Sequence, residues 1–379
     1  MHTFSSRRRQ LGLTLIEAMI SIAIGLVVVS AVSYMYLGSK GAYRGNESVA
    51  QIQDAGRFAL DAITRDVRRT GALGCGTLDS VTTSTTINIT VLPTTTTAVD
   101  ATKINIDPLI NQPMSIRGFQ PAAYGNGVQT AAPAGWTVPA GGPAYFNGDV
   151  LQLQIASGAP VRVTTKPDPV AGLMTIANNS LNGGLTANFS NAEYALLGNC
   201  AGATILQVVN NPAPTQLVAV QFATGNVAAF NQTDFATTTL PTLQHFDQVT
   251  YYVGRGATST ALYRYSLSAG TPPQEVVENI EDMDVVYGVD TSGAHASANI
   301  YEHANSVTGA AGNNWSNVVS VRISVIGVGD QLGAAPQPQT LLFRGPDPNP
   351  VPVPQVAADT RLRQVFTATA TLRDRITLQ

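Results

Sequence analysis

The hydrophobic pattern of the chain opens with one long apolar segment. The 20 residues from Ala18 to Leu37 carry no charge, and most of them are aliphatic. An α-helix needs about 20 such residues to cross a bilayer. After this segment, apolar or small residues recur at steps of three and four, which is the spacing of one helical face. They are Val49, Ile52, Gly56, Ala59, Ile63 and Val67.

The two patterns together predict one continuous helix from Thr14 to about Thr70, which spans the membrane to about residue 37. At 1.5 Å per residue this helix is about 85 Å long, far more than a bilayer requires. Its second half must therefore pack against another part of the protein. Gly38, Gly41 and Gly45 lie between the halves, where curvature costs least. Gly71 or Gly74 can end the helix.

Beyond the helix, period-two segments rich in β-branched residues predict strands. The head is therefore expected to be mainly antiparallel β, and the fold class α+β. The predicted strands are Asp149 to Ala156, Val161 to Thr165, Ala203 to Val209, Gln248 to Val253, Ala261 to Ser266, Val318 to Val328, and Val365 to Leu372.

Two stretches favour loops. Between Asp79 and Asn147 the chain is dominated by Thr, Ala, Pro and Gly, which predicts a long insertion, about 79–147, with few strands of its own. The alternating prolines from Pro346 to Pro354 predict an extended polyproline II spacer before the last strand. Such a segment cannot join a central strand.

The charges around the apolar segment set its orientation. Arg7, Arg8 and Arg9 precede it, which places the N-terminus in the cytoplasm and the head in the periplasm or beyond. A cleaved secretory signal would have a shorter apolar region and a small-residue cleavage site after it. A plain signal anchor explains the arginines but not Glu17, because a carboxylate at the edge of a membrane helix is costly and usually functional.

The segment Gly12-Leu13-Thr14-Leu15-Ile16-Glu17 resembles the processing motif of type IV prepilins. The resemblance implies that a prepilin peptidase cuts after Gly12 and that the new amine on Leu13 is methylated, although Leu13 stands where the family most often has Phe. It also implies that Glu17 neutralises this amine within or between packed subunits. In an apolar environment, burying an ammonium and a carboxylate as a pair costs far less free energy than burying each alone.

Later segments are similar to the PilW-type minor pilins. They include residues 57–60, 65–71 leading to Cys75, 277–283 with 286–290, 315–323 and 361–373. The resemblance implies a pilin-like fold, with a leader at 1–12, a long helix at 13–72 and a periplasmic head at 73–379. It further implies a low-abundance pilin that helps to start type IV pilus assembly at or near the tip. The implied partners are the prepilin peptidase, other minor and major pilins, the inner membrane and, as a further candidate, a tip adhesin.

Composition narrows the chemistry of the head. The chain has 12% charged residues and a formal net charge of −3, without a sustained basic run in the body, so nucleic acid is not an expected partner. Its two cysteines, Cys75 and Cys200, exclude a four-thiolate metal site. In an oxidising compartment they favour one disulfide, the alternative being two buried free thiols.

Other polar residues do not indicate catalysis. His245, His295 and His303 lack the close spacing of a zinc site and are interpreted as loop histidines. The stretch from Asp290 to His295 has the outline of a calcium loop but lacks a bidentate glutamate. The acidic cluster is interpreted as a solvated edge or a subunit contact; it comprises Glu278, Glu281, Asp282 and Asp284. No cofactor or metal is expected.

Three alternatives to the minor pilin stay open. A minor pseudopilin of a type II secretion system shares the leader and the β-rich head. A tip adhesin or ligand-binding module would use the insertion at 79–147 as its binding surface. An enzyme held by a signal anchor ranks last, because the sequence contains no nucleophile elbow, P-loop or HExxH motif.

Overall fold

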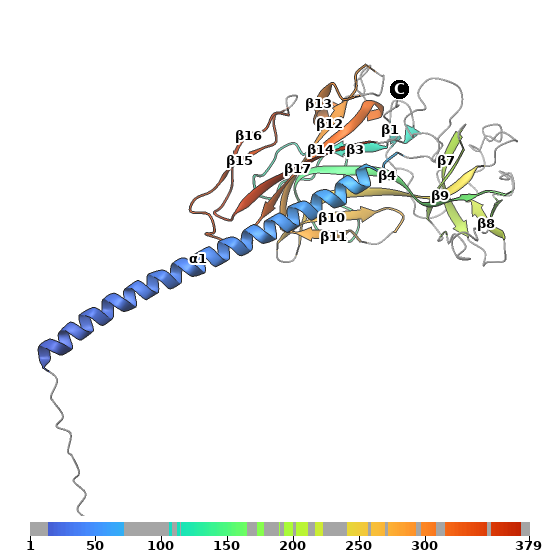
Figure 1. Cartoon of the computed structure of the whole chain (residues 1–379). Helices are drawn as coiled ribbons and strands as arrows, with labels where there is room; N and C mark the ends of the chain where they lie inside the picture. The colour runs from blue at the N-terminus through green and yellow to red at the C-terminus, as the bar shows by residue number, and fades with distance from the viewer. Residues whose placement is uncertain are drawn as a thin grey trace, which may run out of the picture.

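Helix α1 runs without interruption from Leu15 to Val67 and leaves the head as a rod (Figure 1). The computed structural model describes residues 14–71, 106–107, 112–113, 115–164, 173–177, 189, 193–199, 202–210, 217–222, 241–256, 259–269, 272–292, 297–307, 315–346 and 350–372. The predicted helix is confirmed, and it stays helical through Gly38, Gly41 and Gly45.

The end of α1 is fixed by its contact with the head. Gly71 has a φ of +83°, a left-handed conformation that glycine adopts without strain, and its N–H donates to the Gln154 carbonyl at 3.0 Å. Thr70 forms an isolated antiparallel bridge with Ile155. Of the two candidate glycines, Gly71 therefore turns the chain; Gly74 lies outside the described residues.

The larger sheet contains nine antiparallel strands in the described part of the chain, in the order β11-β10-β9-β6-β7-β8-β5, with β4 on β9 and β3 on β4. The strands are β3 (Ile116–Phe119), β4 (Tyr145–Arg162), β5 (Leu173–Ala177), β6 (Tyr194–Asn199), β7 (Gly202–Asn210), β8 (Leu217–Phe222), β9 (Thr242–Arg255), β10 (Thr260–Ser266) and β11 (Gln274–Glu278).

The smaller sheet has the order β13-β12-β14-β17 and is also antiparallel. Its strands are β13 (Ile300–Glu302), β12 (Ile280–Val289), β14 (Val318–Val328) and β17 (Arg363–Thr371). Two ribbons and two short 3₁₀ turns complete the described elements. They are β1 (Ile106–Asp107) with β2 (Gln112–Pro113), β15 (Thr340–Phe343) with β16 (Val353–Val356), η4 (Ala304–Ser306) and η5 (Trp315–Asn317).

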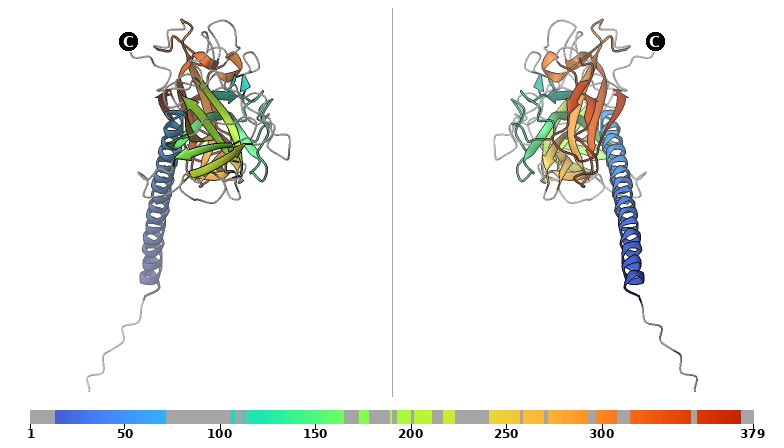
Figure 2. Two further views of the ribbon diagram at one scale, coloured as in Figure 1. Left: turned by 90° about the vertical axis from the view of Figure 1, so that its right-hand side faces the viewer. Right: turned by 90° about the vertical axis from the view of Figure 1, so that its left-hand side faces the viewer.

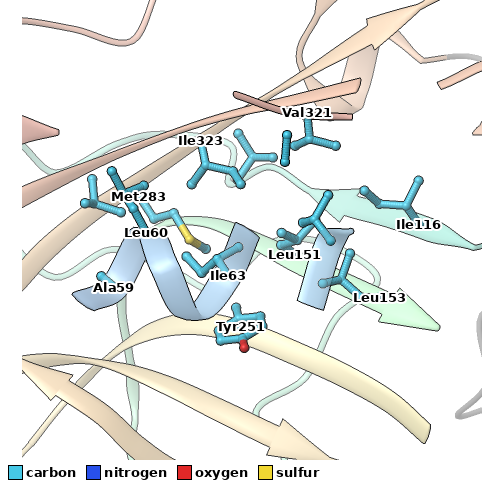
Figure 3. Packing of buried hydrophobic residues seen from close by; sticks show 14 of the residues in the cluster. Ala59, Leu60, Ile63, Ile116, Leu151, Leu153, Tyr251, Met283, Val321 and Ile323 are labelled. Carbon is cyan, nitrogen blue, oxygen red and sulfur yellow. The ribbon is translucent and has the colours of Figure 1, made fainter. Parts of the chain in front are cut away.

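The second half of α1 lies along one side of the head and supplies part of its core (Figure 2). Leu60 and Ile63 lie beside Met283 of the smaller sheet (Figure 3), and Ala59 and Ile323 belong to the same buried cluster. Residues from the larger sheet close the same cluster, so the helix and both sheets share one core; among them are Ile116, Leu151, Leu153 and Tyr251. The predicted apolar face of the helix is buried except for Val49, which is half-buried.

The helix approaches the smaller sheet too closely for a side chain at one position. A Cβ atom built on Gly56 would lie 2.2 Å from Cδ2 of Phe366 in β17. On the sheet, a Cβ on Gly327 would lie 2.9 Å from Cγ2 of Ile52. These two glycines let the backbone of α1 lie against β14 and β17.

Most predicted strands are confirmed. Strand β14 has the predicted limits, and β4, β7, β9, β10 and β17 contain or overlap the others. The separate strand expected from Val161 is instead the end of β4, because β4 continues through a register irregularity between Ser157 and Val161. The longest strand absent from the prediction is β12, whose acidic residues disguise its burial.

The two loop-like stretches are only partly loops. Within the described residues from 115 to 147, Phe119, Trp136 and Tyr145 pack with Tyr252 and Tyr263 in a second aromatic core. The proline-rich stretch does stay out of the central sheet, but its end forms β16, which pairs only with β15 among the described strands. A position at the edge suits prolines, which have no N–H to donate.

At Gly56, helix propensity and packing have opposite effects on the free energy of unfolding when the glycine is replaced by alanine. Gly56→Ala would normally favour an exposed helix by about 1 kcal/mol. Here the added methyl group overlaps the Phe366 ring, and overpacking of this kind costs about 1–3 kcal/mol. We expect a lower free energy of unfolding for the full chain in detergent, followed by the fluorescence of Trp136 and Trp315.

Gly41→Ala is the matched control, because nothing lies within 4 Å of a Cβ at Gly41. It should leave the head unchanged or stabilise the chain. In a double variant, Phe366→Ala should remove most of the additional cost of Gly56→Ala. Equal effects of Gly56→Ala in the presence and absence of the Phe366 ring would contradict the packing argument.

Candidate functional site

The first half of α1 is an apolar surface that the head does not cover. Its large apolar side chains are exposed throughout, from Leu15 (79%) to Leu37 (64%). The helix is long and apolar enough to cross a membrane. An exposed apolar surface of this size marks a membrane or protein contact.

Three serine hydroxyls of this half are satisfied by the helix itself. The hydroxyls of Ser21, Ser30 and Ser33 each donate to the carbonyl four residues earlier at 2.7 Å. This back-bonding is typical of serine within an apolar helix. The segment therefore has hydroxyl groups that need no partner from lipid or from another subunit.

Thr14 caps the first turn, and Glu17 lies within that turn. The Glu17 N–H donates to Thr14 Oγ1 at 3.3 Å, and Thr14 has extended backbone dihedrals, as an N-cap should. The spacing Thr14-x-x-Glu17 is that of a capping box. The Glu17 side chain is exposed at the positive end of the helix dipole. Gly12 and Leu13, which carry the predicted cleavage, lie outside the described residues.

Both cysteines also lie outside the described residues. The disulfide between Cys75 and Cys200 therefore stays a prediction. His295 is likewise outside.

The acidic cluster in the head differs from its interpretation as a solvated edge. Only Glu278 is exposed, whereas Glu281, Asp282 and Asp284 on β12 are 2%, 1% and 5% exposed. The interpretation was wrong because it considered these residues without the arginines that approach them from distant parts of the chain. Buried carboxylates require such partners.

Arg344, which follows β15, is the main cation of this cluster. Its Nη2 donates to Asp282 Oδ1 at 2.6 Å and its Nε to Asp284 Oδ1 at 3.2 Å. The guanidinium also lies over the ring of Tyr124, 3.3 Å from the centroid. Burial alone would lower the pKa of Arg344, but Asp282 and Asp149 raise it above its ordinary value, so the guanidinium stays charged.

Asp149 on β4 joins the larger sheet to this cluster. Its Oδ2 accepts from the Val285 N–H at 2.8 Å, and its Oδ1 accepts from the Tyr124 hydroxyl at 2.7 Å. Burial raises the pKa of Asp149 to about 7, against the opposing effect of Arg344. The site thus holds three buried carboxyl groups for one guanidinium, and a proton on Asp149 reduces the excess negative charge.

A second ion-pair network ties β12 to β17. Arg363 is bidentate to Glu281, with Nε to Oε2 at 2.5 Å and Nη2 to Oε1 at 2.9 Å. Arg361 and Asp359 extend the network toward solvent. Burial opposes ionisation of Asp359, but hydrogen bonds from Arg363 and Arg361 lower the pKa of Asp359 to about 2.

The two described histidines of the head and Asp290 contact other side chains of the head. His303 is fully buried with Nε2 at 3.2 Å from Asp284, and His245 lies in β9 beside Glu193, so neither is an ordinary loop histidine. Asp290 Oδ1 accepts from the N–H of Ser292 at 2.8 Å and from its hydroxyl at 2.5 Å, an Asx-turn within its own loop. Among the described residues no group of three or more His, Cys, Asp or Glu side chains is placed to hold a metal ion.

A long N-terminal helix with an exposed apolar half, packed by its second half on antiparallel sheets, defines a pilin-like protein. Two family models match the chain: type IV pilus-assembly protein W over residues 250–374, and the prokaryotic N-terminal methylation motif over residues 7–33. Together the two matches support a PilW-type pilin.

No curated protein and no solved structure matches the chain. The PilW match covers the smaller sheet, β10, β11 and the three arginines that bind β12, Arg344, Arg361 and Arg363. Residues 115–164, which contribute Tyr124 and Asp149, lie outside either match.

Removing the main buried cation should destabilise the head strongly. Arg344→Met leaves Asp282 and Asp284 without their guanidinium, and breaking a buried pair by removing one partner costs about 3–5 kcal/mol. We expect this loss in denaturant unfolding of the full chain followed by tryptophan fluorescence. Arg65→Met is the control, since the Arg65–Asp61 pair is 69% and 65% exposed and such pairs are worth about 1 kcal/mol or less. Similar losses in the two variants would refute a special role for Arg344.

The raised pKa of Asp149 predicts a pH dependence with a definite sign. Between its ordinary pKa of 3.8 and its raised pKa of about 7, this carboxyl holds a proton in the folded head and releases it in the unfolded chain. Its contribution to stability is therefore fully present below pH 3.8 and is lost as the pH rises to 7, by on the order of a few kcal/mol. The measurement is the free energy of unfolding of wild type and Asp149→Asn across this range. The difference between the two should change with pH, and parallel curves would count against the assignment.

Proposed function

We propose that this chain is a minor pilin that takes part in the initiation and assembly of type IV pili and is inserted through α1 at or near the pilus tip. The observation that carries the proposal is the division of one helix into an uncovered apolar half and a half buried in the head. Such a helix can hold the head first on the inner membrane and then on a fibre of like helices. The PilW and methylation-motif matches support the same class.

The proposal includes a sequence of states for the N-terminus. The precursor lies in the inner membrane with the arginine-rich leader in the cytoplasm and the head in the periplasm. The prepilin peptidase cuts between Gly12 and Leu13, which leaves an amine one residue before the Thr14 cap. The Glu17 carboxylate, in the first helical turn, is then available to this amine or to that of an adjoining pilin. The helix leaves the membrane with its apolar half covered by other pilins.

The functional test is to locate the mature chain. Immunogold labelling of purified pili should place it at or near one end, and a deletion strain should form fewer pili until the gene is restored. Mass spectrometry of the native N-terminus should find Leu13 first. Exclusive association with a secretion apparatus would favour the pseudopilin alternative. Normal piliation with loss of surface binding would favour a tip adhesin.

Glu17→Ala should separate assembly from membrane insertion. Removing the carboxylate makes insertion of the helix easier, so the variant should reach the membrane and be cleaved. In a packed fibre its amine partner would be left buried and unpaired, which typically costs about 3–5 kcal/mol. We expect a stable, cleaved protein and a large loss of piliation in a strain without the native copy.

Glu47→Ala provides the comparison, because Glu47 is an exposed acid on the same helix beyond the apolar segment. It should assemble like the wild type. Wild-type piliation from a stable, cleaved Glu17→Ala chain would show that Glu17 is incidental and that the helix is a plain anchor.

A further inference from the structure

An open groove lies between α1 and the edge of the head at the start of β12. One wall is an exposed stripe of the helix at successive turns, with Asp54, Phe58 and Asp61. The other wall includes Glu278 at the end of β11 and Asp330 just after β14. Its volume is about 800 Å³.

The groove has an exposed aromatic side chain within an acidic rim. Phe58 is 55% exposed, although it lies on the half of α1 that otherwise packs on the head. Four carboxylates and one guanidinium, that of Arg57, line the groove, which gives a formal net charge of −3. Within the described residues, the side chains of Asp54, Glu278 and Asp330 form no ion pair or hydrogen bond, whereas Asp61 pairs with Arg65.

An independent feature of the same groove is a buried hydrogen-bond acceptor that has no partner among the described residues. Asn279 lines the groove and is 8% exposed, and its Oδ1 is buried without a partner among the described residues. Its backbone groups are already used, since its N–H donates to Thr260 and its carbonyl accepts from Val328. A buried acceptor without a donor costs about 1–3 kcal/mol. A ligand that donates a hydrogen bond would remove this cost.

The chain itself shows how a pilin-type helix carries such donors. Lys40 and Arg44 are exposed and one turn apart on α1, between the apolar half and the head. Their midpoint is 14 residues before the middle of the groove, which corresponds to about 20 Å along the helix. A neighbouring helix of the same type, displaced outward by about this distance, brings its basic segment level with the groove. Anionic lipid headgroups, in contrast, are repelled by the carboxylates that line the groove.

We propose that this groove binds the basic segment of a neighbouring pilin-type helix, at the point where that helix leaves its apolar half. Its lysine or arginine side chains pair with Asp54 and Glu278 and donate to Asn279 Oδ1, and an apolar side chain covers Phe58. This inference rests on the proposed function and adds a contact on the head to assembly through the apolar half of α1.

The test is a photocrosslink from the groove in the full chain. Benzoylphenylalanine in place of Phe58, expressed in cells that assemble pili, should form an adduct with another pilin. Peptide mapping should place the adduct in the N-terminal helix of that protein, beside Lys or Arg residues one turn apart. An adduct with lipid, with another protein's head or with a segment lacking basic residues would overturn the inference, as would the absence of an adduct from chain found on pili.

Charge reversal tests the chemistry of the contact. Asp54→Lys with Glu278→Lys should lower the adduct yield about tenfold, because like charges then face each other across the contact. Glu47→Lys, an exposed acid on α1 outside the groove, should leave the yield unchanged. Asn279→Gly removes the whole side chain with its amide while glycine still adopts the φ of +65°, and it should also lower the yield. Replacing the captured basic residues by Glu should restore the yield in the reversed variant.

Two readouts separate failure of this inference from failure of the proposed function. If the chain is found on purified pili but its adduct yield does not change on charge reversal, the groove contact alone is refuted. If the chain is absent from pili that form normally, both the groove contact and the proposed function are refuted. Tryptophan fluorescence of each variant confirms that the head is folded, so a change in yield reports the contact.

Discussion

The contact between α1 and the smaller sheet determines where the apolar half of the helix points. About 33 residues separate Leu15 from the first buried turn at Ser48, which makes a lever of about 50 Å. A tilt of about 10° at the head would move the far end by roughly 9 Å over that length. Close packing at Gly56 and Gly327 restrains such tilts, because the Phe366 ring and the Ile52 side chain fill the space at these glycines and leave the helix few alternative positions.

Strand β12 is tied to its neighbours by buried charges, which are unusual in a core. Glu281 reaches Arg363 on β17, whereas Asp282 and Asp284 reach Arg344 beyond β15. Buried ion pairs add little net stability compared with well-packed apolar residues. Their effect is to penalise any other register, since a shift would leave a carboxylate or a guanidinium buried alone. The network therefore fixes the sheet on which α1 is seated.

The sequence predicts the parts of this structure whose signals are local. The helix follows from hydrophobic spacing, and β14 from its alternation of apolar residues between Val318 and Val328. Strand β12 has no such signal, because its partners Arg344 and Arg363 lie 60 to 82 residues away in the chain. Because these arginines are far away in the sequence, the acids of β12 have no visible partner there and are interpreted as a solvated edge. At the N-terminus, Glu17 is found from sequence, and the structure adds its place one turn after the Thr14 cap.

The buried network also connects the matched and unmatched parts of the chain. Arg344, Asp282 and Asp284 lie within residues 250–374, but Tyr124 and Asp149 do not. Tyr124 lies under the guanidinium and donates to Asp149, which in turn accepts from the backbone of β12. The region from 115 to 164 thus completes the polar core of the PilW-type segment and supplies its own aromatic cluster around Trp136. Because this region and the PilW-type segment share these buried hydrogen bonds, and Leu151 and Tyr251 pack in one core with α1, a surface on either part is oriented relative to α1 by the same core.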